Sequence, residues 1–197
     1  MNKAILGALA MSVLFVGQSY ATTFDFRNPV WNPNGSGTKT VGAISVSALP
    51  GGSNLFWDTQ DGFGVDSGNR DREDDEINNQ EMLKVSFLNP FLLSGFLISD
   101  LFLEHGDFER GQYRLNGGSW TTFTSNGDVN GHLAINFGAT LARTLEFRAV
   151  TLDPGGLRND FAVAAVEGTT PVPEPRSMLL LGSGLVGLAA RFRRTRA

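Results

Sequence analysis

The sequence predicts an all-β protein, folded as a two-sheet β-sandwich that is jelly-roll-like. Short apolar segments in which alternate residues are polar are separated by Gly, Asn and Asp about every eight to twelve residues. Gly is frequent (24 residues), and Phe (15 residues) is the main aromatic residue, as expected of tight turns around a packed core. We expect two flanking helices, one in an N-terminal signal and a hydrophobic one at the C-terminus.

Residues 1–21 have the parts of a secretory signal peptide. A lysine near the start is followed by an apolar run at residues 4–16, and Ser19 and Ala21 place small residues at positions −3 and −1 of a cleavage site. The run is too short for a comfortable membrane span. We therefore expect export by the Sec route, cleavage by signal peptidase and a mature chain that begins at Thr22.

Residues 22–168 are expected to form the β-sandwich domain. Asn116, Gly117 and Gly118 tolerate the positive φ that a hairpin turn needs, so residues 112–123 are predicted to be a hairpin. Alternation and apolar runs predict the remaining strands. These are residues 41–48, 81–88, 91–104 (a strand or two packed on both faces), 132–137, 145–150 and 159–167.

Residues 57–87 contain a crowded acidic loop that is the best candidate for ion binding. Clustered carboxylates repel one another unless a cation lies among them, and Ca²⁺ takes six to eight oxygen ligands. The segment DGFGVD, residues 61–66, has the Gly and Asp offsets of a calcium-binding nonapeptide, although it occurs once. The simpler interpretation, which we prefer, is a solvated loop that keeps the protein soluble, and calcium binding is the alternative. The candidate Ca²⁺ ligands are Asp61, Asp66, Asp71, Asp74 and Asp75.

The sequence offers little that favours an enzyme. His105 and His132 are far apart in the chain and there is no Cys, so no zinc pattern is present. No G-x-S-x-G nucleophile motif occurs in residues 22–168. We expect a non-catalytic protein, and a secreted hydrolase with paired carboxylates is the enzyme alternative.

Three tryptophans suggest a second functional class. Trp31, Trp57 and Trp120 lie in or beside predicted loops, where an exposed indole offers a flat apolar face for a sugar ring. A carbohydrate-binding module is therefore the alternative function. The competing interpretation is that these indoles close the ends of the sandwich core.

The charge of the mature region excludes one class of partner. Residues 22–171 hold ten basic and nineteen acidic residues, a net charge of −9. Such a surface repels phosphate backbones, so no nucleic acid is expected as a partner. Because there are no disulfides, the exported domain must be stabilised by its core or by bound ions.

The tail has two parts. Residues 169–177 form a proline-containing linker that cannot join a helix or sheet and should lie extended. Residues 178–197 are predicted to be a short hydrophobic helix with an Arg-rich cytoplasmic end, which anchors the chain transiently in the inner membrane. The arginines that orient it are Arg191, Arg193, Arg194 and Arg196.

The order of these parts resembles the PEP-CTERM sorting signal of Gram-negative bacteria. Pro173, Glu174 and Pro175 match its motif directly, and a hydrophobic segment and arginines follow. The resemblance implies processing by exosortase, a membrane protease or transpeptidase, and an association with exopolysaccharide. The acidic loop also resembles a segment common in such proteins, with Asn78 in place of the usual second acid. We expect a cell-surface or extracellular-matrix protein.

Overall fold

Antiparallel strands make up most of the chain that the structure describes. This computed structural model describes residues 21–68, 76–78, 81–104, 106–150 and 159–170 together with Gly184. The strands lie in one compact unit, residues 20–171, and the one helical element described there is a 3₁₀ turn, η1 (Pro29–Trp31). The strands are β1 (Ala21–Asp25), β2 (Thr38–Val41), β3 (Ile44–Leu49), β4 (Asn54–Asp58), β5 (Gly62–Asp66), β6 (Met82–Ser99), β7 (Leu103–Glu104), β8 (Asp107–Phe108), β9 (Arg110–Leu115), β10 (Thr121–Thr124), β11 (Leu133–Ala149) and β12 (Ala162–Thr169).

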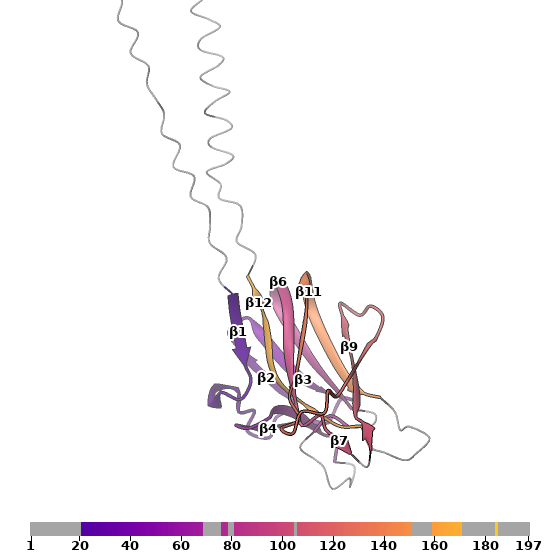
Figure 1. Ribbon diagram of the computed structural model, residues 1–197. Coiled ribbons are helices and arrows are strands. Elements are labelled where there is room, and N and C mark those ends of the chain that lie inside the picture. The colour runs from indigo at the N-terminus through magenta and orange to yellow at the C-terminus, as the bar shows by residue number, and fades with distance from the viewer. Residues whose placement is uncertain are drawn as a thin grey trace, which may run out of the picture. The chain divides into compact units, whose positions relative to one another are not determined.

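Two long strands, β6 and β11, organise the main sheet (Figure 1). β11 pairs with β6 along most of its length, and the other edge of β6 is shared by β3 and β12. Beyond β11 lie β9 and β10, while β2 pairs with β3. β12 also pairs with β1 and β5, and β5 pairs with β4. β7 and β8 form a separate small ladder.

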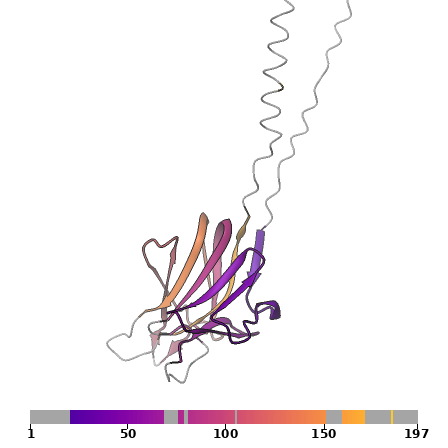
Figure 2. The same ribbon diagram turned by 180° about the vertical axis from the view of Figure 1, so that it is seen from behind.

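The main sheet curves so that its two halves pack against each other across a shared core. Phe96, in the half of β6 that pairs with β12, contacts aromatic rings of the other half. Its ring centroid lies 5.0 Å from that of Phe147, 4.9 Å from Tyr113 and 6.0 Å from Phe123. Figure 2 shows the same two layers from behind. The all-β, sandwich-like fold is thus confirmed; the jelly-roll detail stays a prediction.

A proline lies inside β6, where the sequence predicted a break between two strands. Cross-strand partners in β3 end at Phe87, and partners in β12 begin at Leu92. Pro90 falls in the interval where the strand changes partners. Because no ladder hydrogen bond needs its missing amide there, the proline bends the strand without ending it.

One predicted strand and one predicted hairpin can be compared directly with the structure. The strand expected at residues 41–48 is confirmed from Ile44 onward as β3, but it begins later than expected, because Gly42 has φ of 58° and turns the chain between β2 and β3. The expected hairpin at residues 112–123 is confirmed as β9 and β10. Asn116 and Gly117 have φ of 51° and 70° in its turn.

Several predicted features lie outside the described residues. They are the signal segment up to residue 20, residues 69–75 and 79–80 of the acidic loop, and the tail from residue 171, apart from Gly184. The predictions of the signal helix and the C-terminal helix fall on these residues. Within the described part of the chain, no helix is both long and apolar enough to cross a membrane.

Candidate functional site

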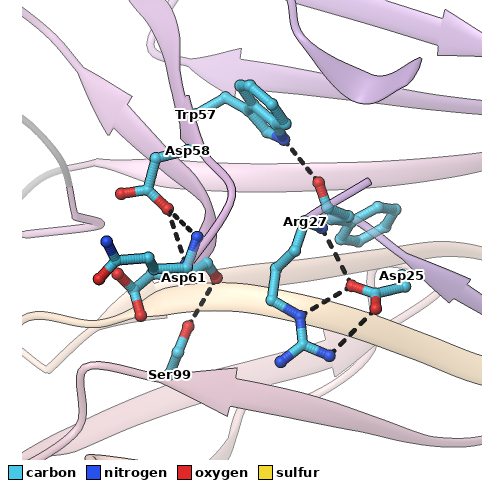
Figure 3. A network of polar contacts seen from close by, with 8 residues as sticks. Asp25, Arg27, Trp57, Asp58, Asp61 and Ser99 are labelled. Carbon is cyan, nitrogen blue, oxygen red and sulfur yellow. Dashed lines mark hydrogen bonds and ion pairs between the residues drawn. The ribbon is translucent and has the colours of Figure 1, made fainter. Parts of the chain in front are cut away.

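A cluster of charged side chains lies where β1 ends beside the turn between β4 and β5 (Figure 3). Strand pairing brings these segments together, since β12 pairs with β1 through Ala165 and Asp25 and with β5 through Val163 and Phe63. Residues far apart in sequence therefore share one end of the sheet. The side chains at this end are Asp25, Arg27, Trp57, Asp58 and Asp61.

Asp25 and Arg27 form a two-pronged ion pair. Arg27 Nε donates to Asp25 Oδ1 at 2.8 Å and Arg27 Nη2 donates to Oδ2 at 3.1 Å, while the Arg27 amide also donates to Oδ1 at 3.0 Å. Hydrogen bonding to the Arg27 side chain lowers the pKa of Asp25, and the same bond raises the pKa of Arg27. Both groups are therefore ionised near neutral pH. Their side chains are 30% (Arg27) and 47% (Asp25) exposed, so a ligand in solvent can reach them.

The turn that carries Asp61 is fixed by three contacts. Asp58 Oδ1 accepts hydrogen bonds from the amides of Gln60 (2.8 Å) and Asp61 (2.7 Å), and Ser99 Oγ donates to the Asp61 carbonyl at 2.6 Å. Gly62 follows with φ of 96°, and a Cβ there would lie 2.4 Å from the Val163 carbonyl oxygen. The close approach to β12 thus requires glycine.

Asp61 extends the cluster toward Arg27. Its charge contributes to the raised pKa of Arg27, and Figure 3 shows Arg27 between Asp25 and Asp61. One exposed guanidinium between two carboxylates provides both donors and acceptors for polar groups of a ligand. Asp25 and Arg27 were not predicted as site residues; the short segment DFR at the end of an alternating strand is the signal in the sequence that could have indicated them.

Trp57 is the aromatic side chain beside this cluster. Its indole is half-buried, lies opposite Phe63 in the ladder, and donates from Nε1 to the Phe26 carbonyl at 2.5 Å. Trp31, by contrast, is only 3% exposed, and its ring centroid lies 4.9 Å from that of Phe26. The prediction of Trp31 as a stacking residue is wrong, because this indole is part of the core.

Trp120, the third predicted stacking residue, lies on a different surface. Two guanidinium groups pack over its ring, Arg114 with its Cζ 4.5 Å from the centroid and Arg148 with its Cζ at 4.1 Å. The indole is thus engaged with these two cations.

The predicted Ca²⁺ ligands are only partly described. Asp61 precedes β5 and Asp66 ends it, so their Cα atoms are about 16 Å apart at the usual strand rise, and they cannot share one ion. Asp71, Asp74 and Asp75 lie outside the described residues, and no group of three potential metal ligands occurs within them. A site that combines Asp66 with those acids stays a prediction.

Glu81 connects the described residues at the two ends of the acidic loop. Its carboxylate is 3% exposed and accepts hydrogen bonds from the amides of Ser67 (3.1 Å) and Asn78 (3.0 Å). Burial raises the pKa of Glu81, and the nearby Asp66 adds to the rise. Glu81 was not predicted to have a role of its own, because nothing in the sequence distinguishes an acid that comes just before a strand.

The other predicted residues belong to the chain ends. Ala21 is the exposed first residue of β1, whereas Ser19 lies outside the described residues. The same holds for the sorting residues Pro173, Glu174 and Pro175 and for the arginines of the tail.

Comparison with known families confirms the predicted sorting signal. Residues 171–194 match the family model described as PEP-CTERM protein-sorting motif. This motif implies export, sorting to the cell surface and processing by an exosortase. The match covers the tail and does not extend into the β domain.

Two solved structures are similar to the chain. One is the family 32 CBM from C. perfringens NanJ in complex with galactose (14% identity, 64% of this chain and 93% of that chain, TM-score 0.36). The other is CBM32-3 from a family 31 glycoside hydrolase from Clostridium perfringens (16%, 77% and 88%, TM-score 0.29). These scores are too low to bear on the ligand. A comparison with curated proteins finds no match.

Proposed function

We propose that the protein is an exported, non-catalytic component of the cell surface or extracellular matrix that associates with exopolysaccharide. The observation that carries this proposal is the sorting motif at residues 171–194, which follows directly on a β domain whose last strand ends at Thr169. Before processing, the chain is held transiently in the inner membrane by its tail, after signal peptidase has removed residues 1–21. Exosortase then processes the chain at its sorting motif.

A second candidate, carbohydrate binding by the cluster at the end of β1, is favoured by its composition. Asp25 and Arg27 present an exposed acceptor and donor pair, and the half-buried Trp57 lies next to them. Sugar hydroxyls accept from guanidinium groups and donate to carboxylates, while the apolar face of a ring packs on an indole. The cluster lies at the opposite end of β1 from Ala21, which pairs with Thr169.

The protonation of the acids supports a non-catalytic role over a secreted hydrolase. A glycosidase needs one carboxylic acid with a raised pKa to protonate the leaving group. The pKa of Asp25 is lowered by Arg27, so this exposed acid is not a proton donor near neutral pH. Glu81 has a raised pKa, yet its carboxylate is buried and accepts hydrogen bonds from two backbone amides.

The carbohydrate proposal can be tested by electrophoresis of the processed protein in gels that contain the host's own exopolysaccharide. We expect retardation, and we expect Arg27→Gln to weaken binding roughly fivefold, since an exposed charged contact contributes about 1 kcal/mol. Arg110→Gln is the matched control, because Arg110 forms a similarly exposed pair with Asp107. Equal retardation of wild type and Arg27→Gln would exclude this cluster.

The location is tested independently by fractionating the cells that make the protein. We expect the mature domain at the cell surface or in the surrounding matrix. Recovery of the bulk of the protein from the cytoplasm would contradict the proposed function as a whole, whatever its sugar affinity.

A further inference from the structure

Three cations of this acidic domain gather on one outer face of the sheet. Lys84 on β6 and Arg114 on β9 both lie opposite Glu146 of β11, in one row across three neighbouring strands. Arg148 lies two residues further along β11, on the same face. Neighbouring strands are about 4.8 Å apart, so the three charges occupy a compact patch.

The alternation of the strands places this patch on the side away from the core. Leu83 and Val85, which flank Lys84 along β6, are fully buried, so Lys84 points to the other face. Its side chain is 36% exposed and that of Arg114 is 28% exposed. The cations are therefore accessible to solvent.

A single carboxylate balances the patch. Glu146 is 7% exposed, and its oxygens lie 2.5 Å from Arg114 Nε and 3.7 Å from Lys84 Nζ. Within the described residues, no carboxylate lies within 4.0 Å of the Arg148 side-chain nitrogens; Nε instead donates to Gln112 Oε1 at 2.9 Å. The patch thus carries a net charge of about +2, on a domain that is otherwise strongly acidic.

Trp120 holds the two guanidinium groups in place. Their Cζ atoms lie 4.5 Å (Arg114) and 4.1 Å (Arg148) from the indole centroid. A guanidinium that packs on a ring keeps its N–H bonds in its own plane, where they can still reach a carboxylate. Because the indole and Gln112 fix Arg148, its donors are oriented before a ligand arrives.

We propose that this face binds the carboxylate groups of an acidic polysaccharide, with Arg148 as the principal contact and Lys84 and Arg114 beside it. The inference rests on the proposed association with exopolysaccharide, and it names the chemistry of the polymer. Guanidinium groups pair with carboxylates through two parallel hydrogen bonds. Threonines and serines continue the face over β2 and β3, where Thr38 bonds Ser47 and Thr40 bonds Ser45, which gives a polar surface for sugar hydroxyls.

A nucleic acid is the less favoured polyanion. Three cations neutralise few phosphates, and the remaining charge of the domain repels a polymer of high charge density. Carboxylates of a polysaccharide are more widely spaced, so fewer of them meet the acidic surroundings of the patch.

The test uses the processed protein recovered from its own cells, with polygalacturonate and fully methyl-esterified polygalacturonate as probes at low ionic strength. The two probes share a backbone and differ in charge. We expect binding to polygalacturonate alone, weakened by added salt. We expect Arg148→Gln and Lys84→Gln each to weaken it roughly fivefold, and Arg148→Lys to weaken it less.

Lys39→Gln is the matched control, since Lys39 lies opposite the buried Val46 and therefore faces the other side of the sheet. It should bind like wild type. Melting temperatures of all variants would identify any loss through unfolding. Equal affinity for the ester, tighter binding to DNA than to polygalacturonate, or unchanged binding by folded Arg148→Gln would each overturn the inference. The proposed cell-surface location and the expected effect of Arg27→Gln are tested separately and would stand after any of these results.

Discussion

Buried polar side chains hold the ends of loops to the sheet of this protein. Glu81 joins residues 67 and 78 at the base of the acidic loop, and Asn159 accepts from the Arg110 amide at 2.7 Å while donating to the Val150 carbonyl at 3.1 Å. Each replaces water as the partner of backbone groups that strand pairing leaves unsatisfied. A single side chain can thus join two segments that are separate in the sequence.

Glu81 should make stability depend on pH in a defined direction. Burial raises the pKa of its carboxyl above the ordinary value of 4.5. The folded state therefore favours the protonated form, and the stabilisation is present below pH 4.5 and is lost as the pH rises through the raised value. Unfolding by urea should show that the stability of wild type minus that of Glu81→Gln declines over this range, by at most about 1.4 kcal/mol per pH unit. A difference that is constant with pH would contradict the assignment.

At the level of elements, the turn between β9 and β10 depends on Asn116. Besides its φ of 51°, its side chain accepts from the amides of Arg143 (2.7 Å) and Thr144 (3.2 Å) and donates to the Leu141 carbonyl at 3.0 Å. The turn is thereby joined to the irregular part of β11, where the pairing with β6 shifts register.

Replacing Asn116 should separate these two contributions. Asn116→Ala loses the hydrogen bonds and puts at positive φ a residue that tolerates this conformation less well than Asn does, so we expect a loss of about 2–4 kcal/mol. Asn116→Gly loses the bonds alone and should be more stable than the alanine variant by about 1 kcal/mol. Urea unfolding measures both values. Equal stability of the two variants would mean that the backbone conformation contributes nothing.

The acidic loop can be tested for calcium by thermal melts at fixed ionic strength with calcium, magnesium or chelator. If the ion is bound, a calcium concentration of 100 times Kd stabilises the protein by about 2.7 kcal/mol and raises the melting temperature by several degrees. Asp66→Ala should abolish the rise. Asp61→Ala should not, because Asp61 lies at the other end of β5. Equal melting temperatures in all three conditions would indicate a solvated loop.

The elements that depend on a short pattern of neighbouring residues were predicted well from the sequence. The hairpin at Asn116 follows from residues that tolerate positive φ, and the core strands follow from alternation. The turn at Gly42 was missed because it interrupts a continuous alternating run, and β6 was divided because Pro90 usually marks a break. In both cases tertiary pairing decides what the local residues do.

For the whole molecule, the tail predicts a processing event. The mature wild-type protein should lack Ser177 and all that follows, whereas Glu174→Ala should leave a longer, membrane-bound form if processing depends on the acid between the two prolines. Intact mass of the protein in each cell fraction decides between the two species. Wild-type protein that still ends at Ala197 would contradict processing at this motif.

Surface sites were harder to predict than the tail, because they depend on long-range pairing. The tail is one continuous segment whose parts occur in order. Arg27 meets Asp61 only through β12, and Arg114 meets Arg148 and Trp120 only because β9 lies beside β11. The three tryptophans have similar surroundings in the sequence. In the structure, Trp31 is part of the core, Trp57 is half-buried at one end of the sheet and Trp120 lies against two guanidinium groups.

The antiparallel pairing of Ala21 with Thr169 and of Asp25 with Ala165 has a mechanical consequence. A pull on the chain beyond Thr169, resisted by polymer held near Asp25, acts along β1 and β12. Hydrogen bonds between antiparallel strands lie perpendicular to the strands, so this force shears all of them at once and does not peel them apart one by one. A force applied between these two points is therefore shared by the whole β1–β12 ladder.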